Sequence, residues 1–384
     1  MGNTTLIFAL ILALLPFSGA YAQTPPKVAS ESYILLDADT GAILAEKNAD
    51  LRLPPASLTK IMTAYMGFRA LAENALASDQ KITVSSRAWA QNVPGSKTFL
   101  EVNSEVSVRD LLFGIIVQSG NDASIALAEG LSGDESAFVA AMNEQAAQFG
   151  LKNTHFTNTT GLPDEMHYSS ARDVAEVIRR TVREFPQDYK IYAEREFTYN
   201  DITQPNRNAL LDAFRGADGV KTGYTKAAGY CLAASAVRDG RRLISVVMKT
   251  KSPAARKRES VKLLTFGFSH FKNVLLFDEA KTRELPLFEG EKDTIAAHPE
   301  ETGLITIPRG ATAEAAFTPV LPLLAPLSRG AEVGAIEINI NGEPARKVKI
   351  VAAEDVAEAG AWKKAVDFVK WRYLGHGDAV LSEW

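Results

Sequence analysis

The 384-residue chain has few of the side chains on which disulfide frameworks and metal centres depend. It contains one cysteine, Cys231, and can therefore form no disulfide within the chain and no site with several thiolate ligands. Its five histidines are scattered and include no His-x-x-x-His pair, the spacing that places two imidazoles on one helix face. We therefore expect no metal site built from His or Cys and no cofactor.

An excess of basic residues is also missing. Lys and Arg number 42 against 46 Asp and Glu, and the formal net charge of -4 removes the electrostatic argument for a nucleic-acid partner. The chain does have a balanced composition, with 46% hydrophobic and 23% charged residues. This composition excludes disordered, collagen-like and coiled-coil classes. The length predicts two or three domains of roughly 150 residues each.

Long apolar runs are missing apart from one near the start. Residues 6–15 are apolar but too few to span a bilayer comfortably. A proline and a glycine follow, and then Ala20-Tyr21-Ala22, a small-x-small cleavage site. This layout predicts a secretory signal peptide over residues 1–22, although no Lys or Arg precedes the apolar run; the alternative is an uncleaved anchor. The mature chain is expected to begin near Gln23 and to work outside the cytoplasm.

Hydrophobic patterning predicts an α/β (α+β) domain over residues 23–272. Strand-like segments lie at both ends of this region and helix-like segments lie between them. The predicted strands are 32–36, 42–45, 219–222, 230–237 and 243–249, and the predicted helices are 57–71, 108–130, 135–149 and 170–185. Strands distant in sequence would pair to close one antiparallel sheet with helices packed against it.

A different pattern begins after residue 272. Helical periodicity disappears, and β-forming runs at 304–307, 333–340 and 347–351 alternate with turn residues. The Asn341-Gly342 turn between the last two runs is a strong hairpin signal. We therefore predict a small all-β domain over residues 273–355, attached through a charged connector at 278–284.

The last segment, residues 356–384, contains a predicted amphipathic helix. Its apolar side chains recur at i, i+3, i+4, i+7 and i+11, and they are Trp362, Ala365, Val366, Val369 and Tyr373. Four basic residues flank this face against one acidic residue. Such a helix can lie in a membrane interface, or it can dock on the protein's own surface. The pattern by itself does not separate these two alternatives.

The first chemical motif is Ser57-Leu58-Thr59-Lys60. Two prolines end the preceding segment, so Ser57 is expected at a helix N-terminus, with Lys60 one turn later on the same face. A serine hydroxyl becomes a nucleophile when a neighbouring base takes its proton, and a neutral lysine amine can be that base. Ser-x-x-Lys alone is weak evidence, because it also occurs at Ser78/Lys81 and Ser269/Lys272.

Two further motifs, each unique in the chain, supply partners. Ser119-Gly120-Asn121 interrupts a helical stretch and offers a hydroxyl and an amide that could relay a proton and hold a substrate amide. A helix N-cap would explain the same residues. Lys221-Thr222-Gly223 falls on a predicted strand, whose edge could bind an extended peptide while Gly223 admits the substrate backbone. Together the three motifs predict a serine nucleophile activated by lysine.

The same three motifs, in this order, are found in class A β-lactamases and penicillin-binding proteins. The chain resembles the low-molecular-mass penicillin-binding proteins, which are serine-type D-alanyl-D-alanine carboxypeptidases of the peptidase S11 family, over nearly the whole mature sequence. The matching segments are 55–63, 118–123, 153–156, 206–208, 218–223, 262–264, 306–310 and the terminal helix. The resemblance implies a transpeptidase-like domain, a β-rich second domain and a terminal helix that anchors the protein to a membrane.

The resemblance also implies a reaction. Ser57 would attack the carbonyl between the two terminal D-alanines of a peptidoglycan stem pentapeptide, with Lys60 as general base. An acyl-enzyme would form and water would hydrolyse it. Ser119 and Asn121 would assist proton transfer and position the peptide. β-Lactam antibiotics, as mimics of the D-Ala-D-Ala end, would acylate the same serine.

Further positions follow from the resemblance. Lys221, Thr222 and Arg256 would hold the substrate's carboxylate, with Arg258 as the alternative to Arg256. The backbone N–H groups of Ser57 and Tyr224 would form an oxyanion hole. Some relatives have histidine where this chain has Tyr224, which leaves a role for that side chain open.

The implied biology is cell wall biogenesis and cell shape regulation by an exported protein, attached to the outer, periplasmic face of the cytoplasmic membrane. Two other functions compete with this hypothesis. A class A β-lactamase would carry a Glu-x-x-Leu-Asn motif, but Glu165 is followed by Met166-His167-Tyr168. A non-catalytic wall-associated protein would not need the intact residues of all three motifs.

Overall fold

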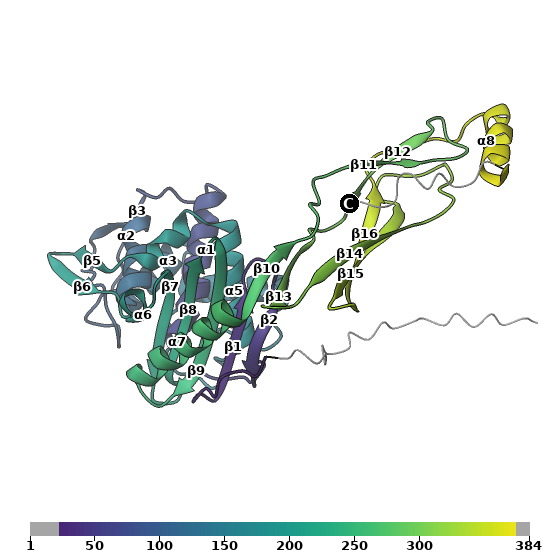
Figure 1. The fold of residues 1–384 in the computed structure, drawn as a ribbon. Helices are drawn as coiled ribbons and strands as arrows, with labels where there is room; N and C mark the ends of the chain where they lie inside the picture. Colours follow the sequence, from purple (N-terminus) through teal and green to yellow (C-terminus); the bar gives the residue numbers. More distant parts are fainter. Residues whose placement is uncertain (1–22, 374–384) are drawn as a thin grey trace, which may run out of the picture.

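The structure, a computed structural model, describes residues 23–373. Figure 1 shows a mixed α/β domain at one end and an elongated β-rich domain at the other, with strands β10 (Phe271–Leu275) and β13 (Leu304–Pro308) between them. The predicted signal peptide, residues 1–22, lies outside the described residues. No helix in the described part of the chain is long and apolar enough to cross a membrane.

A five-stranded antiparallel sheet forms the centre of the first domain, in the order β2-β1-β9-β8-β7. The strands are β1 (Ser32–Asp37), β2 (Ile43–Lys47), β7 (Ala217–Thr225), β8 (Gly229–Arg238) and β9 (Arg241–Thr250). The N-terminal hairpin joins the three later strands where β1 pairs with β9, with Ile34 opposite Val246. The predicted antiparallel sheet is therefore confirmed, and β7 is one of its edges.

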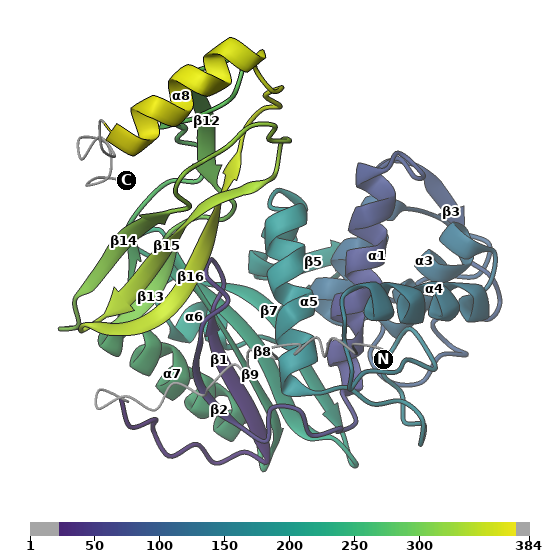
Figure 2. The ribbon, with the colours of Figure 1, turned by 90° about the vertical axis from the view of Figure 1, so that its right-hand side faces the viewer.

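Helices cover both faces of this sheet (Figure 2). Alternate residues of β1 point to opposite sides: Ile34 belongs to the core beneath α1 and α5, and Leu35 to the core beneath α7. The helices are α1 (Lys60–Ala72), α5 (Ala171–Glu184) and α7 (Pro253–His270). The sequence patterns did not predict α7, because its first half contains four consecutive charged residues, 256–259, and most of its buried apolar residues lie in its second half.

Three further helices, α2 (Val108–Phe113), α3 (Asn121–Ser132) and α4 (Glu135–Gln148), form a lobe beside the sheet. The predicted helix over 108–130 is divided into α2, a π-helical turn (Gly114–Gln118) and α3, which is followed by α4. The short strand pairs are β3 (Lys81–Thr83) with β4 (Glu105–Ser107) and β5 (Glu196–Tyr199) with β6 (Ile202–Pro205), and a 3-10 turn (Asp188–Ala193) lies nearby. The short helix α6 (Leu210–Ala213) instead packs against β7, and its Leu210 belongs to the core on the α7 face of the sheet.

The second domain is built on another five-stranded sheet, in the order β11-β12-β16-β15-β14. Its strands are β11 (Arg283–Pro286), β12 (Thr294–Pro299), β14 (Ala313–Pro319), β15 (Glu332–Ile340) and β16 (Glu343–Ala352). The predicted all-β class is confirmed. Asn341 and Gly342 both have positive φ at the predicted hairpin turn between β15 and β16.

The β10–β13 ribbon connects the two domains, and the predicted boundary at 272/273 falls within β10. Its polar side chains bond to the first domain near the end of β1. The Oγ1 atoms of Thr306 and Thr40 lie 2.6 Å apart, and Asn273 donates to Oδ1 of Asp37 at 3.2 Å. The chain ends in α8 (Ala361–Tyr373), which lies across the far end of the β-rich domain (Figure 2).

Candidate active site

Ser57 lies in a 3-10 turn (Ala56–Thr59) that leads directly into α1. The turn is packed tightly from one side by Gly161, where an added Cβ would meet the carbonyl oxygen of Ala56 at 1.8 Å. From the other side, a Cβ on Gly223 of β7 would lie 3.3 Å from the backbone nitrogen of Ser57. Glycine at these two positions lets the neighbouring backbones approach the serine.

Lys60 is buried beneath this serine, with 1% of its surface exposed. Its Nζ donates to Asn121 Oδ1 and to the carbonyl oxygen of Thr160, each at 2.6 Å, and lies 3.4 Å from Ser57 Oγ. Burial lowers the pKa of the Lys60 amine to about 7, with Asp122 acting in the opposite direction. The amine is therefore substantially neutral near pH 7 and lies next to the hydroxyl.

The Ser119–Asn121 segment reaches the same place from the break between the π-helical turn and α3. Ser119 has φ of +63°, and its buried Oγ has no hydrogen-bond partner among the described residues. Asn121 accepts from Lys60 through Oδ1 and donates through Nδ2 to the Pro94 carbonyl at 2.7 Å. The N-cap explanation is wrong, because Gly120 is the capping residue of α3 and no side chain caps it.

Lys221 and Thr222 lie on β7, at the edge of the central sheet beside the serine turn. Lys221 is 2% exposed, and its Nζ donates to the Thr222 carbonyl at 3.2 Å. Burial first, and then the nearby cations Lys60, Arg207 and Arg256, hold the pKa of Lys221 well below its ordinary value. A negatively charged group bound here would relieve this repulsion.

The cavity at the mouth of the site has a volume of about 360 Å³. Its lining residues are Ser57, Gly95, Ser96, Ser119, Arg207, Thr222, Gly223, Tyr224 and Arg256. Neither Ser78 nor Ser269, the serines of the two additional Ser-x-x-Lys matches, is among them. The structure thus brings together, from one edge strand and three helical segments, the residues that the sequence singled out.

Two arginines border this cavity. Arg256 donates to the Gly223 carbonyl at 3.0 Å, whereas Arg258 pairs with Glu259 at 2.7 Å and does not line the cavity. Arg207 was missed as a site residue, since it lies in a loop after β6 without any periodic pattern. The only signal was its place in the Asn206-Arg207-Asn208 segment of the resemblance.

The side chain of Tyr224 is 54% exposed at the mouth and stacks on Tyr230, with ring centroids 4.3 Å apart. Its backbone follows Gly223, close to the nitrogen of Ser57. Among the described residues, no group of three or more His, Cys, Asp or Glu side chains could hold a metal ion. The geometry suits acyl transfer from a substrate with a negative end: a serine, a buried amine beside it, and an electropositive mouth.

Comparison with known proteins agrees with this chemistry. The family model for D-alanyl-D-alanine carboxypeptidases (Peptidase_S11) matches residues 20–252, and the model for the C-terminal domain of penicillin-binding protein 5 matches residues 271–358. The chain is 42% identical to D-alanyl-D-alanine carboxypeptidase DacA of Haemophilus influenzae over 356 residues, which is 91% of each chain. It is 40% identical to DacC of Escherichia coli, over 95% of this chain and 94% of that protein.

Solved structures show the same likeness. The crystal structure of penicillin-binding protein 5 from Haemophilus influenzae superimposes with a TM-score of 0.84 at 42% identity. The match covers 88% of this chain and 100% of that one, so the likeness includes both domains.

Proposed function

The chain belongs to the D-alanyl-D-alanine carboxypeptidase family, and from this premise we propose that it removes the terminal D-alanine from peptidoglycan stem pentapeptides through an acyl-enzyme on Ser57. The observation that carries the proposal is the buried Lys60 amine beside the Ser57 hydroxyl, at the base of an electropositive cavity. The same site would be acylated by β-lactams.

In the first step, neutral Lys60 takes the Ser57 proton while Oγ bonds to the carbonyl carbon of the penultimate D-alanine. The C–N bond then breaks, and the departing D-alanine amine receives the proton from Lys60. Ser119 would relay that proton: it lines the same cavity as Ser57, and its Oγ has no hydrogen-bond partner among the described residues. Water finally attacks the ester, with Lys60 again as the base, and frees the serine.

Binding would use the edge of β7. An extended peptide can add to this edge as a further strand, and its terminal carboxylate would lie near Lys221, Thr222 and Arg256. The close approach of Gly223 to the Ser57 nitrogen supports an oxyanion hole made from the N–H groups of Ser57 and Tyr224. Arg207 adds a second guanidinium to the same mouth.

Neither competing function gains support from the site. Glu165, the residue considered for a β-lactamase-type deacylation, is exposed and does not line the cavity. A non-catalytic protein would have no need to keep a lysine buried beside a serine, since burying a charged amine is costly.

Mass spectrometry after brief exposure to penicillin tests the proposal. Wild type should carry one adduct on the Ser57 peptide, and Ser57→Ala should carry none. Ser78→Ala is the matched control, because it removes the serine of another Ser-x-x-Lys match and should be labelled like wild type. An adduct on Ser78 or Ser269 would overturn the site. Release of D-alanine from diacetyl-Lys-D-Ala-D-Ala separates a carboxypeptidase from a β-lactamase, which would hydrolyse penicillin rapidly without releasing D-alanine.

We also propose that α8 attaches the protein to a membrane surface. The helix docks on the β-rich domain through polar groups: Asp367, 2% exposed, accepts from the Glu289 N–H at 2.9 Å, and Lys363 pairs with Asp293 at 2.8 Å. Its apolar side chains point outward, with Trp362 82% and Phe368 54% exposed. A helix kept only for docking would turn these groups inward, so this orientation favours a lipid partner.

Among the side chains that the structure describes, the outward face includes Phe368, which the predicted face did not, and Phe368 is more exposed than Val366. Flotation with vesicles of anionic phospholipid tests the role of the face: the chain should float, and the chain ended after Gly360 should not. A Trp362→Glu, Phe368→Glu double variant, which keeps the docking contacts, should also lose binding. Unchanged flotation of that variant would reject the anchor.

Export to the periplasm, with attachment to the outer face of the cytoplasmic membrane, remains our proposal. It is supported by the signal-like residues 1–22 and by the location of peptidoglycan outside the cytoplasm. A fusion of residues 1–22 to a periplasm-dependent reporter should be exported and processed near Gln23. A reporter that stays in the cytoplasm would contradict it. A location at the outer face of the cytoplasmic membrane also agrees with a role in cell wall biogenesis and cell shape regulation.

A further inference from the structure

The Lys60 amine has three polar neighbours, and their number fixes the orientation of a neutral amine. A neutral amine has two hydrogens and one lone pair. If the hydrogens go to Asn121 Oδ1 and the Thr160 carbonyl, both at 2.6 Å, the lone pair remains for the Ser57 hydroxyl. The Thr160 carbonyl therefore matters as much as Asn121 for aiming the base, although it belongs to none of the three motifs.

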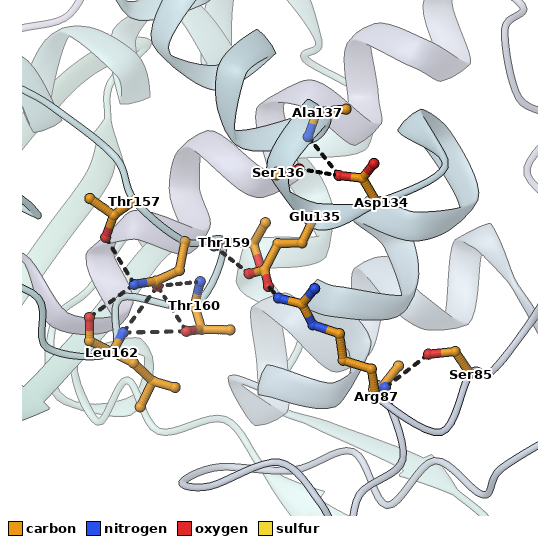
Figure 3. A network of polar contacts seen from close by, with 12 residues as sticks. Ser85, Arg87, Asp134, Glu135, Ser136, Ala137, Thr157, Thr159, Thr160 and Leu162 are labelled. Atoms are coloured by element: carbon orange, nitrogen blue, oxygen red, sulfur yellow. Dashed lines mark hydrogen bonds and ion pairs between the residues drawn. The ribbon is translucent and has the colours of Figure 1, made fainter.

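Thr159, the residue before this carbonyl, is held by hydrogen bonds from two sides. On one side the N–H and Oγ1 of Thr159 donate to Glu135 Oε1 at 3.0 and 2.7 Å (Figure 3). On the other side Thr63, one turn after Lys60 on α1, donates from Oγ1 to the Thr159 carbonyl at 2.8 Å. All the polar groups of Thr159 are thus occupied, and the residue is fully buried.

Glu135 is a charged side chain kept inside the protein at the first turn of α4. It is 6% exposed, and its second oxygen, Oε2, pairs with Arg87 at 2.5 Å. Asn158 completes the local order, since its Oδ1 accepts from the backbone N–H groups of Thr160 and Gly161. Burying a carboxylate is unfavourable unless it is paired and hydrogen-bonded, and Glu135 meets this condition through Arg87 and Thr159.

We propose that Glu135 is a positioning residue of the carboxypeptidase reaction: through Thr159 it holds the Thr160 carbonyl against Lys60, and so directs the lone pair of the amine at Ser57. The inference rests on the proposed function, in which Lys60 is the general base. It adds a requirement from α4, an element that contributes no residue to the lining of the cavity.

Release of Thr159 should affect Lys60 in two ways. The amine would lose one fixed acceptor and rotate away from the hydroxyl. Water would also reach the amine, and because burial is the main cause of its lowered pKa, that pKa would rise. The charged groups that act on this amine, Asp122 and Arg207, and its neighbours Lys221 and His167, would remain in place.

The test compares Glu135→Ala with Glu135→Gln in the full chain. The rate constant of acylation by a fluorescent penicillin is measured from pH 5 to 9. Glu135→Ala should acylate on the order of 10²-fold more slowly at pH 7, because misplacing a catalytic group by about 1 Å costs that much. The acidic limb of its pH–rate profile, where the acylation rate falls as Lys60 is protonated, should move to higher pH. Glu135→Gln keeps an acceptor for Thr159 and should recover most of the rate and the wild-type limb.

Asp134→Ala is the matched control. Asp134 caps the same end of α4 by accepting from the Ala137 N–H at 2.9 Å, and it makes no contact with Thr159 (Figure 3). This variant should lower the melting temperature without moving the pH profile. Thr63→Val, which removes the opposite contact to Thr159, should reproduce the limb shift in weaker form.

Three outcomes would overturn the inference: a wild-type rate and profile in Glu135→Ala, equal losses in Glu135→Ala and Asp134→Ala, or a Glu135→Gln variant as slow as Glu135→Ala. Failure of the proposed function itself would look different, since wild type would then form no adduct on Ser57.

Discussion

The acylation rate should report the protonation of Lys60 directly. Only the neutral amine can accept the Ser57 proton, and burial brings the pKa of Lys60 to about 7. A free lysine has a pKa of about 10.4, so at pH 7 fewer than about one molecule in 10³ would hold the neutral amine. In this site about half of the molecules hold the neutral form at that pH.

The sign and size of the pH effect follow from this value. Lowering the pH from 8 to 5 should reduce the neutral fraction from about 90% to about 1%, so acylation should slow by roughly 90-fold. Above pH 8 the rate should level off, because nearly all of the amine is already neutral. The assay is stopped-flow acylation by a fluorescent penicillin under single-turnover conditions, with thermal stability followed over the same pH range.

A charge substitution should move this profile in a known direction. Arg207 lowers the pKa of Lys60, so Arg207→Gln should raise that pKa and move the acidic limb to higher pH. Arg258→Gln is the control, because Arg258 pairs with Glu259 outside the cavity and its loss should leave the limb in place. A rate that is flat from pH 5 to 8, or that still rises tenfold per pH unit at pH 9, would refute the assignment of Lys60 as the base.

Three more variants probe separate parts of the site. Ser119→Ala should slow acylation at least about tenfold. The melting temperature should change little, since the Oγ of Ser119 has no partner to lose among the described residues. A large loss of stability would speak against a role in proton relay. Gly223→Ala should slow acylation and destabilise the fold by about 1–3 kcal/mol. The reason is that the added Cβ would crowd the Pro55 carbonyl at 3.0 Å and the Ser57 nitrogen at 3.3 Å. Penicillin labelling of this variant at the wild-type rate would contradict the close approach of β7 to the serine turn. Lys60→Met should be inactive, and its stability relative to wild type should be greatest below pH 7, where the wild-type fold must bury a protonated amine. Urea denaturation should show this advantage shrinking by about 1.4 kcal/mol per pH unit between pH 7 and 10, and an advantage independent of pH would disprove the lowered pKa.

The sequence predicted best those features that are local or repeat along the chain. Runs of β-forming residues revealed the strands of the sheet, Asn341-Gly342 revealed the hairpin, and Ser57 and Lys60 share one turn of chain. The order of the three motifs predicted that they would meet, but not how. In the structure β7 meets the serine turn at Gly223, where an added Cβ would crowd Pro55 and Ser57, and the break before α3 meets Lys60 through the Asn121 side chain.

Features that depend on tertiary packing escaped prediction. No pattern marks Arg207 or Glu135, since each acquires its partners from segments far away in sequence. The helix α7 was missed because its charged first half lacks an apolar stripe and is ordered by the sheet beneath it. The direction in which α8 turns its apolar face depends on Asp367, whose partner is a backbone group of Glu289.

The contact between Lys60 and the Thr160 carbonyl has a consequence for mutational scans and for sequence drift. A main-chain oxygen is present whatever residue occupies position 160, so alanine there leaves this contact in place. It would remove only the bonds of the buried Thr160 hydroxyl, which donates to Asn158 Oδ1 at 3.0 Å and accepts from the Leu162 N–H at 3.3 Å. Selection to keep the contact should therefore act on the neighbours that fix the peptide plane, Glu135, Asn158 and Gly161. Replacing the following amide with an ester would weaken the carbonyl as an acceptor and also remove the Gly161 N–H, which donates to Asn158 Oδ1 at 2.8 Å. This backbone change therefore probes the contact that no side-chain substitution at position 160 can remove.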